Sequence, residues 1–171
     1  MPDRPTCPAA RCSSAAGRAA TAVHARQYAR QVPTNSRFHL AVPVDDLAQA
    51  RAFYGDVLGL EQGRESDHWI DWNLFGHQLV THLAPPAQGQ RPTSDVDGHE
   101  VPIPHFGVLL EADEFDALAA RLTAAGTRFL IDPYLRFPGQ RGEQWTMFFI
   151  DPAGNALEFK AFTDDSAVFA A

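Results

Sequence analysis

The sequence has little cysteine, because its only two cysteines, Cys7 and Cys12, lie close to the N-terminus. So few thiols provide neither a disulfide framework nor a thiolate zinc site, and a reducing cytoplasm is the expected location. No apolar run approaches the roughly 18 residues that a membrane span needs. The 171 residues carry a net charge of −7 and form no basic stripe. This charge argues against nucleic acid or a membrane surface as the main partner.

Residues 1–35 differ in composition from the rest of the chain. They are rich in Ala, Arg, Ser, Thr and Pro, and Asp3 is their only acidic residue. They lack a sustained apolar periodicity, which predicts a disordered N-terminal extension. The same basic, acid-poor composition is typical of a transit peptide, whereas a secretory signal would need an apolar core of about 7–15 residues.

From residue 36 onward the sequence uses one pattern of elements twice. Residues 36–84 predict a strand, a helix and further strands: "RFHLAVPV", "DDLAQARAFYGDVLG", a short stretch around Leu60, "HWIDWNLF" and "HQLVTHLAP". Residues 103–163 repeat the order: "PHFGVLLEA", "DEFDALAARLTAAG", "TRFLIDPYLRF", "WTMFFIDP" and "NALEFKAF". A module of about 50–60 residues is small for independent stability. The sequence therefore predicts an α+β fold in which two βαβββ modules share one core.

The remaining boundaries follow from turn and capping residues. Residues 85–102 have the Pro-, Gly- and polar-rich composition of a linker, and residues 164–171 form a C-terminal tail. Asp45 and Asp113 are the predicted N-caps of the two helices, since a short acidic side chain satisfies the first free backbone N–H groups.

Three residues occupy related strand positions: His39 and His105 in the first strand of each module, and Glu158 in the last strand. Taken singly, a histidine in a strand is more often a core residue than a ligand, and a glutamate in a terminal strand usually faces water. Together they form a set of two imidazoles and one carboxylate, which is the composition of the facial triad of non-haem iron oxygenases. A pseudo-twofold axis between the modules would bring the two histidines close to each other.

The chain also resembles a known superfamily through "FHLAVPVDDLAQARAFYGDVLGL", "PHFGVLLE" and "FFIDPAGNALEF". These motifs resemble the vicinal oxygen chelate superfamily, which includes glyoxalase I, bleomycin-resistance proteins and extradiol dioxygenases. The resemblance covers about residues 37–163. Within the superfamily, the chain resembles in particular a group of small two-module proteins described as predicted dioxygenases of the extradiol type. The resemblance implies two modules around a mixed-sheet, half-barrel-like cleft, with a metal held by His39, His105 and Glu158.

The resemblance also raises the question of a fourth ligand, which glyoxalase-type members take from the last strand of the first module. Aligning Gly76 with Gly154 places Val80 opposite Glu158, and valine cannot bind a metal. His82 comes two residues later on the same strand face, about 6–7 Å along. It is either a fourth ligand, an acid–base catalyst like the histidine of extradiol enzymes, or a residue at the strand end; we predict the catalyst, since imidazole exchanges protons near neutral pH.

Substrate contacts are predicted in "LRFPGQRGEQWTMFF", namely Arg136, Gln144 and Phe148. Arg136 can pair with a substrate carboxylate through two hydrogen bonds. Phe148 stands where many extradiol enzymes have a substrate-bonding tyrosine, which weakens the expectation of catechol cleavage.

We therefore expect a metal-dependent dioxygenase of the extradiol type that acts on a small substrate with vicinal oxygens, for which an aromatic ring is one candidate. Fe(II) is the expected metal, with Mn(II), Zn(II) and Ni(II) as alternatives; dioxygen is the second substrate, and the resemblance allows a homodimer. A lyase or isomerase of the glyoxalase or epimerase kind is the first alternative, and a metal-free ligand-binding or resistance protein is the second, because a fold alone does not fix function.

Overall fold

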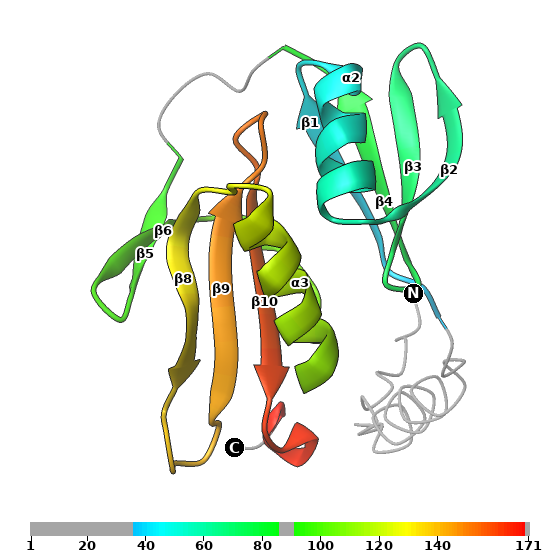
Figure 1. The fold of residues 1–171 in the computed structure, drawn as a ribbon. Coiled ribbons are helices and arrows are strands. Elements are labelled where there is room, and N and C mark those ends of the chain that lie inside the picture. Colours follow the sequence, from blue (N-terminus) through cyan, green and yellow to red (C-terminus); the bar gives the residue numbers. More distant parts are fainter. Residues whose placement is uncertain (1–35, 86–90, 170–171) are drawn as a thin grey trace, which may run out of the picture. The chain divides into compact units, whose positions relative to one another are not determined.

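The computed structural model describes residues 36–85 and 91–169, so the predicted N-terminal extension lies outside the described residues. The first module forms a four-stranded sheet with the strand order β1-β4-β3-β2. Its elements are β1 (His39–Val44), α2 (Leu47–Ala50), the π-helix η1 (Arg51–Val57), β2 (Glu61–Ser66), β3 (Trp69–Leu74) and β4 (His77–Leu83). Figure 1 shows α2 and η1 as one continuous coil against this sheet.

The second module repeats this topology with the strand order β7-β10-β9-β8. Its elements are β7 (His105–Phe106), α3 (Ala112–Ala124), β8 (Phe129–Arg136), β9 (Gln144–Ile150) and β10 (Ala156–Phe162), followed by the 3₁₀ turn η2 (Asp165–Ala167). In both sheets the first and last strands of the module are parallel neighbours, and the other pairs are antiparallel. The predicted α+β fold of two βαβββ modules is thus confirmed.

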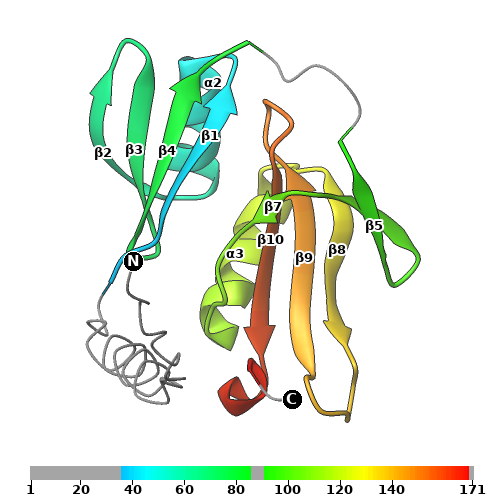
Figure 2. The same ribbon diagram turned by 180° about the vertical axis from the view of Figure 1, so that it is seen from behind.

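The segment assigned as linker contains a two-stranded hairpin, β5 (Thr93–Val96) and β6 (His99–Pro102). The two strands meet at Asp97 and Gly98, both with positive φ. An Asp-Gly pair suits this tight turn because both residues tolerate a left-handed backbone. Figures 1 and 2 show the hairpin beside β8 of the second module.

Both predicted helix caps are wrong. Asp46, not Asp45, caps α2, because its backbone is extended and its carboxylate accepts hydrogen bonds from the N–H groups of Ala48 (2.7 Å) and Gln49 (3.2 Å). The helix α3 begins after Glu111, whose own N–H donates to the Glu114 carboxylate at 3.3 Å.

One hydrophobic core is built from both modules. It contains helix side chains such as Phe53, Tyr54 and Leu118 together with sheet side chains such as Trp72 and Phe149. Polar contacts join the modules as well: the Tyr54 hydroxyl donates to Asp151 at 2.7 Å, and the Asn155 amide donates to the Pro43 carbonyl at 2.8 Å. The strand faces that pack on the helices therefore form the shared core, and on the opposite face of the second sheet Val101 of the hairpin packs with Ile131, Phe148 and Ala156 in a second, smaller cluster.

None of the helices in the described residues is long and apolar enough to cross a membrane.

Candidate functional site

The open face of the second sheet brings together two of the three predicted metal ligands. His105 lies on β7 and Glu158 on the neighbouring β10, and their Nε2 and Oε2 atoms are 3.4 Å apart. The glutamate side chain is only 10% exposed, so its oxygen atoms are surrounded by protein groups. Thr146 donates to Glu158 Oε1 at 3.1 Å, and the Lys160 ammonium lies 3.2 Å from the same oxygen.

The hydrogen bonds of His105 fix the role of each ring nitrogen. Its Nδ1 lies 2.9 Å from the Pro102 carbonyl oxygen, which can only accept, so Nδ1 carries a proton. In the neutral ring the Nε2 lone pair then faces a carboxylate oxygen of Glu158. Two acceptors at this distance need a proton or a metal cation between them, and a backbone carbonyl on the second nitrogen is the usual support of a histidine ligand. The pair therefore provides two of the three donor groups of the predicted metal site.

The first module carries the equivalent positions with different residues. His39 pairs with Gln78 across the parallel strands, as His105 pairs with Ala156. Two residues further along, Val80 corresponds to Glu158, and His82 corresponds in the same way to Lys160. His82 is exposed and pairs with Pro43 and Trp69. The position in the first module that is equivalent to Glu158 is thus occupied by a valine, which cannot bind a metal.

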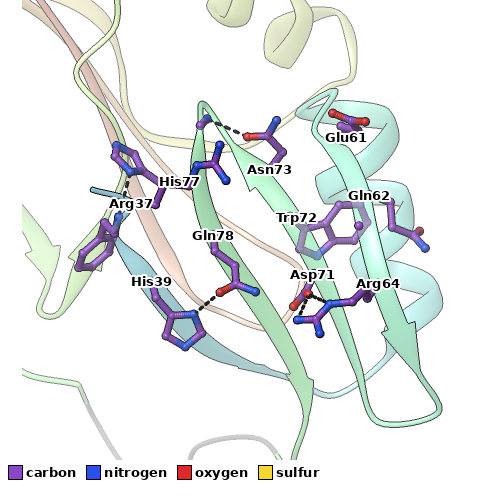
Figure 3. A pocket seen from close by; sticks show the side chains of 13 residues that line it. Arg37, His39, Glu61, Gln62, Arg64, Asp71, Trp72, Asn73, His77 and Gln78 are labelled. Carbon is purple, nitrogen blue, oxygen red and sulfur yellow. Dashed lines mark hydrogen bonds and ion pairs between the residues drawn. The ribbon is translucent and has the colours of Figure 1, made fainter. Parts of the chain in front are cut away.

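His39 lines a cavity of about 580 Å³ on the open face of the first sheet. Its Nδ1 lies 2.8 Å from the Gln78 side-chain oxygen, which assigns the proton to Nδ1 and makes Nε2 the acceptor nitrogen (Figure 3). Arg64 and Asp71 form an ion pair of 3.0 Å in the same cavity. Both predicted ligand histidines thus present Nε2 as an acceptor, one supported by a glutamine and the other by a backbone carbonyl.

Among residues 36–85 and 91–169, no three His, Cys, Asp or Glu side chains gather as a metal-binding group. His39 lies on one open sheet face, and His105 and Glu158 lie on the other, while the helix-covered faces form the shared core. The expectation that the pseudo-twofold arrangement brings the two histidines close within one chain is therefore not met.

The predicted substrate-binding residues also lie on the open face of the second sheet. Phe148 is buried, and its ring meets the His105 ring edge-on with centroids 4.7 Å apart. Arg136 already has a partner, because its Nε lies 2.6 Å and its Nη2 2.9 Å from the two carboxylate oxygens of Asp97. Gln144 is 7% exposed, and no donor in the described part of the chain reaches its buried Oε1.

Sequence reasoning missed Asp97 and Tyr134. The Tyr134 hydroxyl donates to the Asp97 carboxylate, and this bond, followed by that from Arg136, lowers the pKa of Asp97. Burial and the bond to Asp97 raise the pKa of Tyr134 to about 12. The signal for Asp97 was present in the sequence, since an Asp-Gly pair between two short alternating runs predicts a hairpin tip; its contact with Arg136 needs the fold.

With the fold and site described, the family can be stated. A family model described as the Glyoxalase/Bleomycin resistance protein/Dioxygenase superfamily matches residues 37–159. The chain therefore belongs to this superfamily, many of whose members are metal-dependent enzymes. A search of curated proteins found no match.

Several solved structures are similar. A glyoxalase/bleomycin resistance protein/dioxygenase from Alicyclobacillus acidocaldarius is 34% identical with a TM-score of 0.66, and the match covers 79% of this chain and 97% of that one. The fosfomycin resistance protein FosX from Listeria monocytogenes is 17% identical (TM-score 0.58; 77% and 96% covered). A lactoylglutathione lyase from Agrobacterium tumefaciens is 21% identical (TM-score 0.52; 76% and 96% covered). The last two share the fold.

Proposed function

We propose that this protein is a metal-dependent dioxygenase of the extradiol type, with His39, His105 and Glu158 as the metal ligands. The observation that carries the proposal is the His105–Glu158 pair, in which an imidazole lone pair faces a carboxylate oxygen at 3.4 Å. A cation between them would satisfy both acceptors. Two imidazoles and one carboxylate suit Fe(II) or Mn(II) and leave coordination positions open.

The third ligand has to come from a different sheet face. Because the helix-covered faces of both modules form one core, the faces that carry His39 and Glu158 do not close on each other within the chain. A homodimer in which the first module of one chain covers the second module of its partner would bring the two faces together. Each dimer would then hold two metal sites, each built from both chains.

The roles of the chain's own residues follow from their contacts. Thr146 and Lys160 hold the Glu158 carboxylate through Oε1 and leave Oε2 toward His105. Gln78 orients His39, and Phe148 packs against His105, which restricts water on that side of the ring. When bound, a metal of this kind supplies Lewis-acid and redox chemistry for a substrate with two adjacent oxygens. His82, about 6–7 Å beyond Val80 along its strand, is the proposed proton carrier.

The absence of a metal-binding side chain at Val80 favours the dioxygenase over a lyase or isomerase of the glyoxalase kind. Four protein ligands suit proton chemistry on zinc or nickel, whereas three leave room for a bidentate substrate and dioxygen. Val80 is 4% exposed and occupies the position that corresponds to Glu158.

The test combines metal analysis with oxygen consumption. We expect protein purified without oxygen to hold about one Fe(II) or Mn(II) per chain and to consume oxygen with a member of a catechol panel. His105→Ala should lose the metal. Bound zinc or nickel with no oxygen uptake would indicate the lyase or isomerase, and no bound divalent metal would overturn the proposal.

The shared site has a test of its own, in which His39→Ala and Glu158→Ala chains are mixed and allowed to exchange. Each variant alone should bind metal poorly at both sites. A mixed dimer should regain one intact site, with His39 from the Glu158→Ala chain and the pair His105 and Glu158 from the other. Mixtures that bind no more metal than the separate variants would refute the dimeric site, and wild-type chains treated in the same way serve as the control.

A further inference from the structure

The hairpin β5–β6 presents a carboxylate to the second sheet in the manner of a bound ligand. Asp97 lies at its tip, in the left-handed conformation of the Asp97–Gly98 turn. The Arg136 Nη2 donates to Oδ1 at 2.9 Å, the Tyr134 hydroxyl donates to Oδ2, and Nε lies 2.6 Å from Oδ2 as an ion-pair contact without a hydrogen bond. Hydrogen bonds of an arginine and a hydroxyl to one carboxylate are charge-assisted, and such bonds are the stronger ones in carboxylate recognition.

Of the two partners in this ion pair, Arg136 is held in place more firmly than Asp97. Arg136 and Tyr134 lie on β8 within a four-stranded sheet, and the guanidinium stacks 4.7 Å from the Phe137 ring centre. Its side chain is 15% exposed, whereas that of Asp97 is 40% exposed at the tip of a two-stranded hairpin. The exposed tip of the two-stranded hairpin is therefore the partner that can move away, while Arg136 stays in place on β8.

A second observation indicates that this surface is built for a ligand. Gln144 lies directly opposite Arg136 on β9, and its Oε1 is buried with no donor within the described residues. Leaving a buried acceptor without a partner is costly, so native structures rarely do it without a reason. A ligand that carries a carboxylate on Arg136 and a hydroxyl or N–H donor beside it would satisfy both groups.

The contact also lies on the same sheet face as the proposed metal site. Tyr134 pairs with Thr146 across the strands, and Thr146 donates to Glu158. Thr146 pairs in turn with Lys160, so Tyr134 and Glu158 are offset by two strand spacings and two residues, roughly 12 Å between their backbones. The site around Arg136 therefore lies on the same sheet face as the His105–Glu158 pair, further along the strands.

We propose that Asp97 is a built-in substitute for the ligand: its carboxylate occupies a site formed by Arg136, Tyr134 and Gln144 that binds a carboxylate group of the substrate. The proposal rests on the proposed function in taking the bound molecule as the substrate of a metal centre on the same sheet face, and it identifies that substrate as a small organic acid. The substrate carboxylate replaces that of Asp97, while the hairpin stays attached through Val101, which is fully buried against Ile131, Phe148 and Ala156. Tyr134 acts as a protonated donor throughout.

Removal of the competing carboxylate provides the test. A tethered group competes at an effective concentration in the millimolar range or above, so Asp97→Asn should bind benzoate at least 10-fold more tightly than wild type. Asparagine suits the variant because it tolerates the positive φ at this turn. Benzoate affinity is measured by calorimetry, and the Arg136 Nε–H resonance, assigned with Arg136→Lys, should shift on titration.

Asp95→Asn is the matched control, because it removes one negative charge from the same hairpin and still accepts from the Gly98 N–H as Asp95 does at 3.4 Å. We expect it to change benzoate affinity by less than 2-fold. Equal changes in both variants would show a through-space charge effect alone and would overturn the proposal. Asp97→Gly, which keeps the turn without any side chain, should reproduce the gain, and Arg136→Gln in the Asp97→Asn background should abolish it.

Two further outcomes are decisive. Tighter binding of inorganic phosphate than of benzoate by Asp97→Asn would overturn the carboxylate class. Weaker benzoate binding by Asp97→Asn than by wild type would overturn the substitute role of Asp97. Metal content is measured in every sample: its absence from all proteins, including wild type, would refute the proposed function while the gain in benzoate affinity would still support this site.

Discussion

The two modules use the same scaffold to present different chemistry. Each has a histidine at the start of its first strand, with Nδ1 bonded to an oxygen and Nε2 left as the acceptor nitrogen. The second module adds a carboxylate at Glu158, where the first has Val80. The first module instead offers an open polar cavity of about 580 Å³ around its histidine. The comparison suggests that the second module supplies the carboxylate of the proposed metal site and that the first module supplies the remaining histidine.

The largest expected effect comes from the close approach of the β7 backbone to β10 in the second module. A Cβ built on Gly107 would overlap the carbonyl oxygen of Glu158, so no side chain fits there. Gly107→Ala should push β7 away from β10, separate His105 from Glu158 and lower the free energy of unfolding by about 3 kcal/mol, the upper end for overpacking. Urea unfolding and metal titration measure the two consequences.

The first module provides the control for this change. Ala41 stands two residues after His39, as Gly107 stands two after His105, and it tolerates a Cβ. Ala41→Gly should cost only about 0.5–1 kcal/mol, through backbone entropy, and should leave the fold intact. If Gly107→Ala proved as mild as Ala41→Gly, the close approach of β7 to β10 would not hold the His105–Glu158 pair.

The next effect concerns the support of the two histidines. Gln78 orients His39 by its side chain, whereas the Pro102 backbone orients His105, so only the first can be removed by mutation. Gln78→Ala should weaken metal binding about 10–100-fold, as loss of a ligand's hydrogen-bond partner usually does. Gln62→Ala is the control, because Gln62 lines the same cavity but bonds Glu65. Equal metal affinity in both variants would contradict a ligand role for His39.

The sequence allowed much of the scaffold to be predicted, for a physical reason. Strand and helix periodicities repeat in both copies, and the turn glycines Gly76 and Gly154 set the register that places Val80 opposite Glu158. The local pattern did not reveal which faces of the two sheets would be covered. That choice depends on the contact between modules, such as Tyr54 with Asp151, which are 97 residues apart in the chain.

The dependence on contacts between modules explains which predicted site residues lie together in the structure and which do not. His105 and Glu158 are neighbours because adjacent parallel strands bring them together, which periodicity and topology predict. The position of His39 relative to them depends on how whole modules pack, and the bond from Asp97 to Arg136 depends on a hairpin in a segment that composition assigns to a linker.

A smaller effect is expected at the polar contact between the modules. Burial and the Asp151 charge raise the pKa of Tyr54. Tyr54→Phe should lower the free energy of unfolding by about 1.5 kcal/mol, since Asp151 keeps its bonds to Asn155 at 2.6 and 2.8 Å. Above about pH 10 the unfolded tyrosine loses its proton while folded Tyr54 keeps it, so stability from this group falls as pH rises. The gap between wild type and Tyr54→Phe should therefore narrow in urea titrations above pH 10, and a constant gap would contradict a buried, protonated Tyr54.

The smallest expected effect separates the two candidate caps of α2. Hydrogen bonds from the backbone and side chain of Gln49, and then from the Ala48 backbone, lower the pKa of Asp46. A lowered pKa means that the contribution of Asp46 to stability is present above about pH 4 and is lost as the carboxylate is protonated below it. Asp46→Ala should thus lower the urea midpoint slightly at pH 7 and not at pH 3, whereas Asp45→Ala should leave it unchanged at both. If Asp45→Ala lowered the urea midpoint more than Asp46→Ala, Asp45 would be the N-cap of α2. The test is sensitive in the first module because α2 has only four residues before it continues as a π-helix, whereas α3 has 13 residues to stabilise its own first turn.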